Sequence, residues 1–187
     1  QELVRFFIKN SRSKVPKEVC PEWGKNPIRK PPLDARTLLS SGKSEEYVIE
    51  LYLLQNLNKL EEVVGSGVSE VYNQIYGYQK RFLDILTIHK TVNLLKSTVI
   101  EIKPDPSRIE EGLTELTRYM QWVKDTIAKD PDLTFGILLT QMPESPDVEK
   151  FRNISKEKSG TLGILPERIN WIGYEIVNSE LLFTPIC

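Results

Sequence analysis

The sequence predicts an α/β fold in which a central mixed β-sheet is flanked by helices. The expected order along the 187 residues is helix, strands, helix, strand, short helix and strands. A long amphipathic helix between two apolar strands is typical of the crossover that joins neighbouring parallel strands. Apolar residues make up 40% of the chain and charged residues 27%, which is an ordinary mixture for one globular domain.

Residues 1–42 are expected to be a largely irregular extension ahead of a folded domain at 43–187. Five prolines fall in this stretch, and each fixes φ and removes a backbone donor. Within residues 1–36, nine basic side chains stand against four acidic ones, a balance of 9 − 4 = +5. A patch of this sign suits a phosphate backbone, and it is equally typical of a solvated arm. Residues 3–8 alone have the apolar pattern of a short strand or helix.

The first helix of the domain is expected to run from residue 44 to the glycines at 65 and 67. Ser44 is a favourable N-cap, and acidic residues follow it in the first turn. Glycine is common where a helix ends. Apolar residues recur at spacings of three, as one helix face requires: they are Val48, Leu51, Leu54, Leu57 and Leu60.

Three strands are expected next, at residues 68–78, 82–88 and 94–102. The third is almost continuously apolar, which is typical of a strand buried on both faces. Pro104 and Pro106 end it.

A long helix should follow, with Ser107 as N-cap and Glu110 completing a capping box. Its apolar positions recur at spacings of 4, 3, 4, 3 and 4: they are Ile109, Leu113, Leu116, Met120, Val123 and Ile127. The Asp-Pro-Asp sequence at 130–132 breaks this helix. A strand at 133–139, a short helix at 146–154 and strands at 171–177 and 181–186 complete the domain.

Several classes of protein are disfavoured by the composition. Cys20 and Cys187 are expected to be free thiols, and one His without a CxxC motif makes a structural zinc site improbable. No apolar run reaches the roughly 18 residues of a membrane span, and no signal-peptide pattern opens the chain. We therefore expect an intracellular protein without membrane association. The net charge of −1 does not exclude DNA, because the distribution of charge matters more than its sum.

Asp84, Glu101 and Lys103 form the grouping most suited to chemistry. Asp84 lies in the strand RFLDILTI, and Glu101 and Lys103 share one face at the end of the next strand, VIEIK. Two carboxylates can hold a hard cation such as Mg²⁺, which lowers the pKa of a bound water, and a lysine can orient that water. On spacing alone, a surface ion pair between Glu101 and Lys103 is the simpler interpretation.

These motifs resemble the PD-(D/E)xK (restriction-endonuclease-like) nuclease superfamily, and its archaeal and archaeal-virus members most. In that superfamily the first acid stands on one strand of a hairpin and the E-x-K on its partner. The next helix often carries Q-x-x-x-Y. Here that helix reads TELTRYMQWV, with Tyr119 in place and Glu115 instead of the usual Gln. The resemblance covers about residues 44–140.

The resemblance implies a DNA endonuclease that depends on Mg²⁺ or Mn²⁺. Asp84 and Glu101 would hold the metal with the Ile102 carbonyl, and Lys103 would position or activate water. In the leading helix, ELYLLQNL, it assigns Glu50 as the third acid, with Glu46 as a rival one turn earlier. The residues that it implies for orienting the site or touching DNA are Tyr119, Arg118 and Glu115.

The expected partners are DNA, of branched or other structure, and a second copy of the chain, because duplex DNA presents two strands to cut. A catalytically silent DNA-binding module on the same fold and a protein–protein adaptor remain alternatives. His89 is expected on a surface loop. The tyrosines at 72, 76 and 78 could stack on bases, although packing is the simpler role. Trp171 and Tyr174 are expected to pack in the C-terminal sheet or at a subunit interface.

Overall fold

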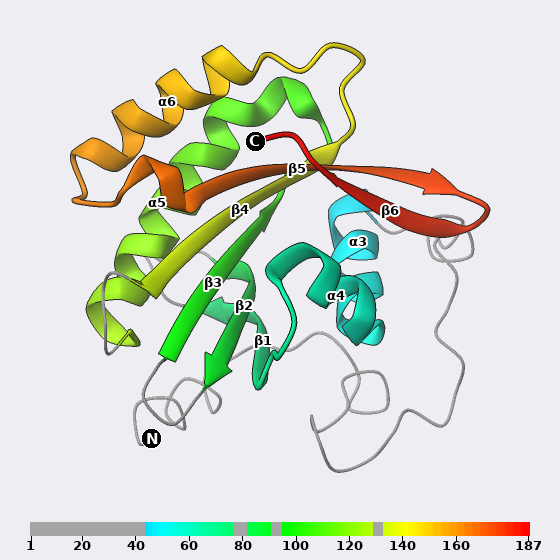
Figure 1. Ribbon diagram of the computed structural model, residues 1–187, viewed down its shortest axis with the longest axis horizontal. Coiled ribbons are helices and arrows are strands. Elements are labelled where there is room, and N and C mark those ends of the chain that lie inside the picture. The colour runs from blue at the N-terminus through cyan, green and yellow to red at the C-terminus, as the bar shows by residue number, and fades with distance from the viewer. Residues whose placement is uncertain (1–43, 77–81, 91–94, 129–132) are drawn as a thin grey trace.

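The fold is α/β, with one six-stranded mixed sheet whose strands follow chain order (Figure 1). A computed structural model describes residues 44–76, 82–90, 95–128 and 133–187; the predictions for residues 1–42 and for Tyr78 lie outside these ranges. The strands are β1 (Glu70–Tyr76), β2 (Phe82–Lys90), β3 (Leu95–Ile102), β4 (Thr134–Gln141), β5 (Ile169–Val177) and β6 (Glu180–Pro185). The pairs β3–β4 and β4–β5 are parallel, and the other three are antiparallel.

Helices cover both faces of this sheet, as expected (Figure 1). The helices are α3 (Glu45–Gln55), α4 (Leu57–Val64), α5 (Ile109–Thr126) and α6 (Val148–Gly160), with short 3₁₀ turns at Pro106–Arg108 and Pro166–Arg168. The first two helices pack in one hydrophobic core and the last two in the other. Because α5 links β3 to β4 and α6 links β4 to β5, both parallel pairs have helical crossovers. No described helix is long and apolar enough to cross a membrane.

The single helix expected over residues 44–65 is in fact two. Asn56 has φ −121° and ψ 84°, outside the helical region, so it separates α3 from α4. Its side-chain Nδ2 donates to the Tyr52 carbonyl at 2.9 Å, which satisfies a carbonyl at the end of α3. The apolar spacing of three continues through this break, so the pattern alone could not reveal it.

The prediction that Ser107 is the N-cap of a capping box is wrong. Asp105 instead accepts a hydrogen bond from the Ser107 backbone N–H at 2.8 Å, and a 3₁₀ turn precedes α5. The short helix expected over 146–154 is also longer, because α6 runs from Val148 to Gly160. Its buried face includes Ser155 and Ser159, small polar residues that hide the apolar period. The two strands expected at the C-terminal end are joined by a turn at Asn178 and Ser179, which have positive φ values of 50° and 70°.

Candidate active site

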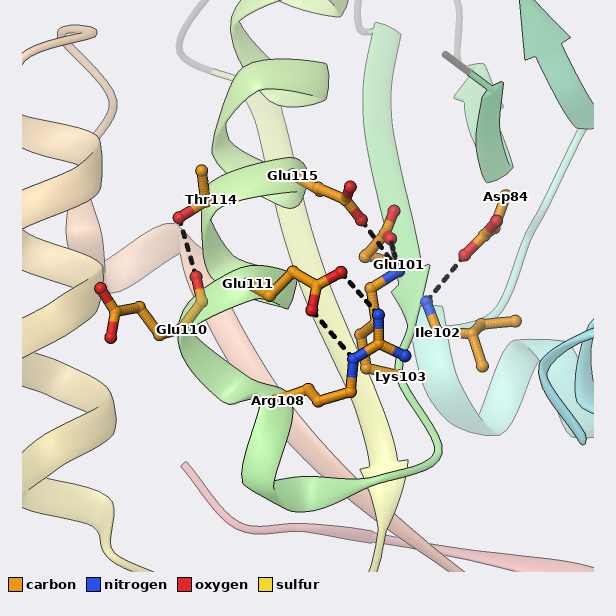
Figure 2. Close-up of polar contacts among 9 residues, drawn as sticks. All are labelled: Asp84, Glu101, Ile102, Lys103, Arg108, Glu110, Glu111, Thr114 and Glu115. Atoms are coloured by element: carbon orange, nitrogen blue, oxygen red, sulfur yellow. Dashed lines mark hydrogen bonds and ion pairs between the residues drawn. The ribbon is translucent and has the colours of Figure 1, made fainter.

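The candidate site lies where β2 and β3 leave their regular pairing. Ile85 pairs with Ile100, which sets Asp84 and Glu101 opposite each other one position further along. Asp84 is 5% exposed and Glu101 is 2% exposed. Asp84 Oδ2 accepts a hydrogen bond from the Ile102 backbone N–H at 2.9 Å (Figure 2). In a strand the N–H and C=O of one residue point to the same side, so the Ile102 carbonyl also points toward β2.

Lys103 bridges two carboxylates beside this pair of acids. Its Nζ lies 2.5 Å from Glu101 Oε1 and 2.9 Å from Glu115 Oε2 of α5 (Figure 2). The ion pair between Glu101 and Lys103 therefore exists, but it is buried and is not the surface pair that spacing alone suggested. Burial by itself would lower the pKa of Lys103. The two carboxylates outweigh that effect and raise the pKa above its usual value.

Both buried acids are strongly disposed to hold a proton. Burial raises the pKa of Asp84 well above its ordinary value, and the charges of Glu46 and Glu50 raise it further. The hydrogen bond from the Ile102 N–H lowers this pKa, but it does not offset the other effects. Burial and the neighbouring Asp84 raise the pKa of Glu101 in the same way, although Lys103 opposes them. Two carboxyl groups in one desolvated site cannot both ionise cheaply when the ammonium beside them, that of Lys103, also pairs with Glu115.

Glu101 Oε2 is an unsatisfied acceptor. It is buried and has no hydrogen-bond partner within the described part of the chain. A divalent cation prefers oxygen ligands of this kind and would neutralise the repulsion between Asp84 and Glu101. The residues present therefore fit a cation held by two carboxylates. Within the ranges that the structure describes, no three His, Cys, Asp or Glu side chains already converge on a single point.

The two acids of α3 are placed differently around Asp84. Glu50 is 2% exposed, and its carboxylate accepts hydrogen bonds from Asn73 Nδ2 at 3.1 Å and Gln74 Nε2 at 3.0 Å. Glu46 is half-buried, and its charge acts on Asp84 more strongly than that of Glu50 does. Both acids thus face the site: Glu50 is anchored to β1, and Glu46 has the larger electrostatic effect.

The amides of Asn73 and Gln74 were missed by the sequence analysis. Asn73 pairs with Ile85 and Ile75 pairs with Leu83, so Gln74 stands opposite Asp84. Gln74 has φ +50°, an uncommon value for a residue that is not glycine. Ile75 and Leu83 belong to the hydrophobic core on the α5 side of the sheet, whereas Ile85 belongs to the core on the α3 side. The buried face therefore changes along β1 and β2 at this irregular point.

Helix α5 contributes the other half of the site. Tyr119 is 4% exposed on the same helix face as Glu115; burial raises the pKa of its phenol, as do the charges of Glu101, Glu115 and Asp84. Gly112 was also missed: a Cβ there would lie 3.0 Å from Lys103 Cγ and 2.6 Å from Leu138 Cδ1. Its missing side chain lets α5 lie directly over the stem of Lys103.

Arg118 lies at the surface beside the buried groups. It lines an open hollow of about 590 Å³ together with Glu115 and Arg108. The Arg108 guanidinium contacts Glu111 at 2.6 Å (Figure 2). Among the ion pairs of the described residues, none joins Arg118 to Asp84 or Glu101. The hollow is a surface approach to Glu115 and, through it, to Lys103.

Four further expectations concern residues outside the site. His89 is part of β2 and not of a loop, and its Nε2 lies 3.1 Å from the Gly65 carbonyl. The Tyr72 hydroxyl donates to Glu70, so this contact occupies it. Trp171 and Tyr174 are buried in the C-terminal sheet as expected, with the Trp171 indole 2.9 Å from Thr140 Oγ1. Cys187 is a free thiol.

Comparison of the chain with known protein families, with curated proteins and with solved structures finds no match in any of the three.

Proposed function

We propose that this protein is a metal-dependent DNA endonuclease with a restriction-endonuclease-like core. The observation that carries the proposal is the buried pair Asp84 and Glu101, which share one site with Lys103 while Glu101 Oε2 has no partner. Buried charges at a strand end are costly unless a ligand compensates them. The order of elements, with a helix, an acid strand, an E-x-K strand and a helix bearing a tyrosine, supports the same assignment.

Asp84 and Glu101 would hold Mg²⁺ or Mn²⁺, with the Ile102 carbonyl as a further ligand. A bound divalent cation would lower the pKa of a water and stabilise negative charge on the phosphodiester. Lys103 has a raised pKa and so stays protonated. It would therefore orient water or stabilise the developing charge, and would not serve as the base.

Glu115 and the surrounding residues would keep Lys103 in place. Glu115 accepts from Lys103 at 2.9 Å, so it would retain the ammonium in the site if Glu101 held a cation instead. Tyr119 would pack against this pair, and Glu50 and Glu46 would add negative charge near Asp84. Glu115, which stands where the superfamily usually has Gln, would thus help to position Lys103.

We propose that the protein acts inside the host cell and that its partners are DNA and a second copy of the chain. Arg108 and Arg118 border the surface hollow near Glu115 and could contact a phosphate. The basic balance of residues 1–36 would add cationic charge that the acidic site itself lacks. Two active sites related by a two-fold axis would act on the two strands of a duplex or a junction.

Cleavage of labelled DNA tests the proposal. Linear duplex, single strand, flap and four-way junction substrates are incubated with Mg²⁺, with Mn²⁺ and with EDTA. Cutting should require metal and should fall by at least about 100-fold in Asp84→Asn and in Lys103→Met. The exposed residues Glu144 and Lys150 offer matched controls, Glu144→Gln and Lys150→Met, which should cut normally. Metal-dependent cutting that survives in Asp84→Asn would reject this site.

A catalytically silent DNA-binding module is the second candidate. The specific observation in its favour is that both Glu101 and Glu115 already engage Lys103. Such a module would bind DNA with a strong salt dependence but without metal dependence, and none of the four DNA structures would be cut. If the protein neither cuts nor binds DNA, the adaptor becomes the favoured alternative.

A further inference from the structure

Three cationic side chains gather at the opposite end of the central strands from Asp84 and Glu101. Lys96 lies near the start of β3, Lys124 in the last turn of α5, and Arg168 at the end of the 3₁₀ turn before β5. Lys96 Nζ lies 4.9 Å and Arg168 Cζ 5.3 Å from the ring centroid of Phe135. An aromatic ring attracts cations, but it does not neutralise their charge.

A small hollow beside this cluster is lined by Lys124, Thr134 and Arg168. Met120, Ile164 and Leu165 form its apolar walls, and no described acidic residue lines it. Its volume of about 10 Å³ is close to the space that one water-sized atom needs. The hollow could therefore admit one oxygen of a larger group whose remainder stays at the mouth.

Two buried donors in this hollow have no hydrogen-bond partner among the residues that the structure describes. Arg168 Nη1 and Thr134 Oγ1 are both buried without a hydrogen-bond partner, and Thr134 is 4% exposed as a residue. Lys124 Nζ donates to the Gly163 carbonyl at 2.8 Å, which leaves two of its three protons available. Buried donors without an acceptor are destabilising, so this arrangement calls for an acceptor atom.

The charge of the surroundings indicates what kind of acceptor fits. None of the three cations forms an ion pair with a described acidic residue. Lys96 does not line the hollow and donates to the Val64 carbonyl at 3.2 Å, so it adds positive charge nearby without supplying an acceptor. A neutral water could accept the hydrogen bonds but would leave the positive charge uncompensated. An oxyanion would provide both the acceptor and the charge.

We propose that Lys124, Thr134 and Arg168 form a binding site for one oxygen of an oxyanion, such as a phosphate group. Thr134 pairs with Ser97 and Leu138 with Glu101, so the site lies about four residues, roughly 13 Å, along the sheet from the acids. It is separate from the candidate active site and does not depend on the proposed nuclease activity. A free phosphate and the phosphodiester of a polynucleotide share this chemistry.

Thermal unfolding in sulfate or phosphate tests the site. The full chain is titrated with each anion while NaCl keeps the ionic strength constant. We expect a saturable rise in Tm, and Arg168→Gln should raise the apparent Kd by at least about tenfold. Arg152→Gln makes the same change of charge on the exposed surface of α6 and should leave the Kd unchanged. A linear rise in Tm, or equal curves for the two variants, would overturn the proposal.

Further variants separate anion binding from altered folding and from a carboxylate of the chain itself. Thr134→Val removes the unpartnered hydroxyl with little change in shape. This variant should be as stable as the natural chain, but it should bind sulfate more weakly. Asp130 and Asp132 lie close to Thr134 in the sequence. If Asp130→Asn or Asp132→Asn creates saturable sulfate binding that the natural chain lacks, the chain's own carboxylate fills the site and the proposal is wrong.

A labelled single-stranded oligonucleotide distinguishes the sources of the oxyanion. Binding is measured without metal in the Asp84→Asn background, with and without sulfate. If sulfate competes and Arg168→Gln weakens oligonucleotide binding, while Arg152→Gln does not, the site takes a backbone phosphate. If sulfate binds saturably without competing, the site takes a small free anion. Both results support an oxyanion site, and absence of saturable binding by either ligand excludes it.

Discussion

At the scale of single residues, burial decides the properties of the candidate site. Asp84 and Glu101 would be ordinary carboxylates on a surface, but here burial raises the pKa of both, and the charge of Asp84 raises that of Glu101 further. Lys103 cannot neutralise both, because Glu115 shares its ammonium. The site is therefore held in an unfavourable charge state whenever both acids are ionised and no cation is bound.

Substitution of Asp84 by Asn should stabilise the metal-free protein at neutral pH. Because the folded state raises this pKa, it binds more protons than the unfolded state above about pH 4, and the free energy of unfolding falls as pH rises toward the folded pKa. Asn keeps an acceptor for the Ile102 N–H but cannot ionise. Urea unfolding in EDTA should show a gain on the order of one to a few kcal/mol at pH 7–8.

The pH dependence of that gain is the decisive control. It should shrink as the pH falls toward about 4 and vanish below that value, where Asp84 is protonated in both the folded and the unfolded state. Glu144→Gln removes an exposed carboxylate and should leave the pH profile almost unchanged. If Asp84→Asn is less stable than the natural chain across the whole range, the carboxylate is compensated in some other way.

The sequence predicted some of the site residues better than others. An acid and an E-x-K at the ends of adjacent apolar strands can be recognised from the sequence, because the alternation of side chains along a strand determines which face each residue occupies. Asn73 and Gln74 are not visible in this way, since their role depends on the contact between α3 and β1. Glu46 and Glu50 lie one helical turn apart, so periodicity could not decide between them.

At the scale of elements, the position of α5 over β3 depends on one missing side chain. Gly112 sits above Lys103 and Leu138. Gly112→Ala would gain up to about 1 kcal/mol of helix propensity, but overpacking typically costs about 1–3 kcal/mol. We expect a net loss of stability and a fall in DNA cleavage, because the displaced helix carries Glu115 away from Lys103.

Gly160→Ala provides the matched control. Gly160 ends α6, and an added Cβ there would meet nothing within 4 Å. This variant should be as stable as the natural chain or more so by up to about 1 kcal/mol, with unchanged cleavage. Chemical denaturation of both variants separates the two cases. Equal stability of the two would mean that α5 shifts without cost and that the close approach is unimportant.

The element order was predictable, whereas several boundaries were not. The 3.6-residue period identified α5, and the continuous apolar run identified β3. The break at Asn56 depends on local backbone dihedrals and on a side-chain contact to Tyr52, which leave the apolar spacing intact. The length of α6 was underestimated because its buried face uses serines where a large apolar residue is usual.

At the scale of the whole molecule, the site joins the two cores that the sheet separates. Helix α3, which carries Glu46 and Glu50, belongs to one helical layer, and α5, which carries Glu115 and Tyr119, belongs to the other (Figure 1). Asp84, Glu101 and Lys103 connect these layers through the ends of β2 and β3. A change in charge at this point should therefore affect the stability of the entire domain and not only a local segment.

Added Mg²⁺ or Mn²⁺ should therefore raise the Tm of the whole domain in one cooperative transition. At about 100 times the Kd, binding to the folded state alone contributes about 2.7 kcal/mol, which for a domain of this size is roughly 5–10 °C. The effect should grow with pH, because the cation competes with protons for two carboxyl groups whose pKa values are raised. EDTA should reverse it, and Glu144→Gln should retain it. A metal-induced shift that persists unchanged in both Asp84→Asn and Glu101→Gln would place the cation elsewhere, because each variant removes one of the only two carboxylates proposed to hold it.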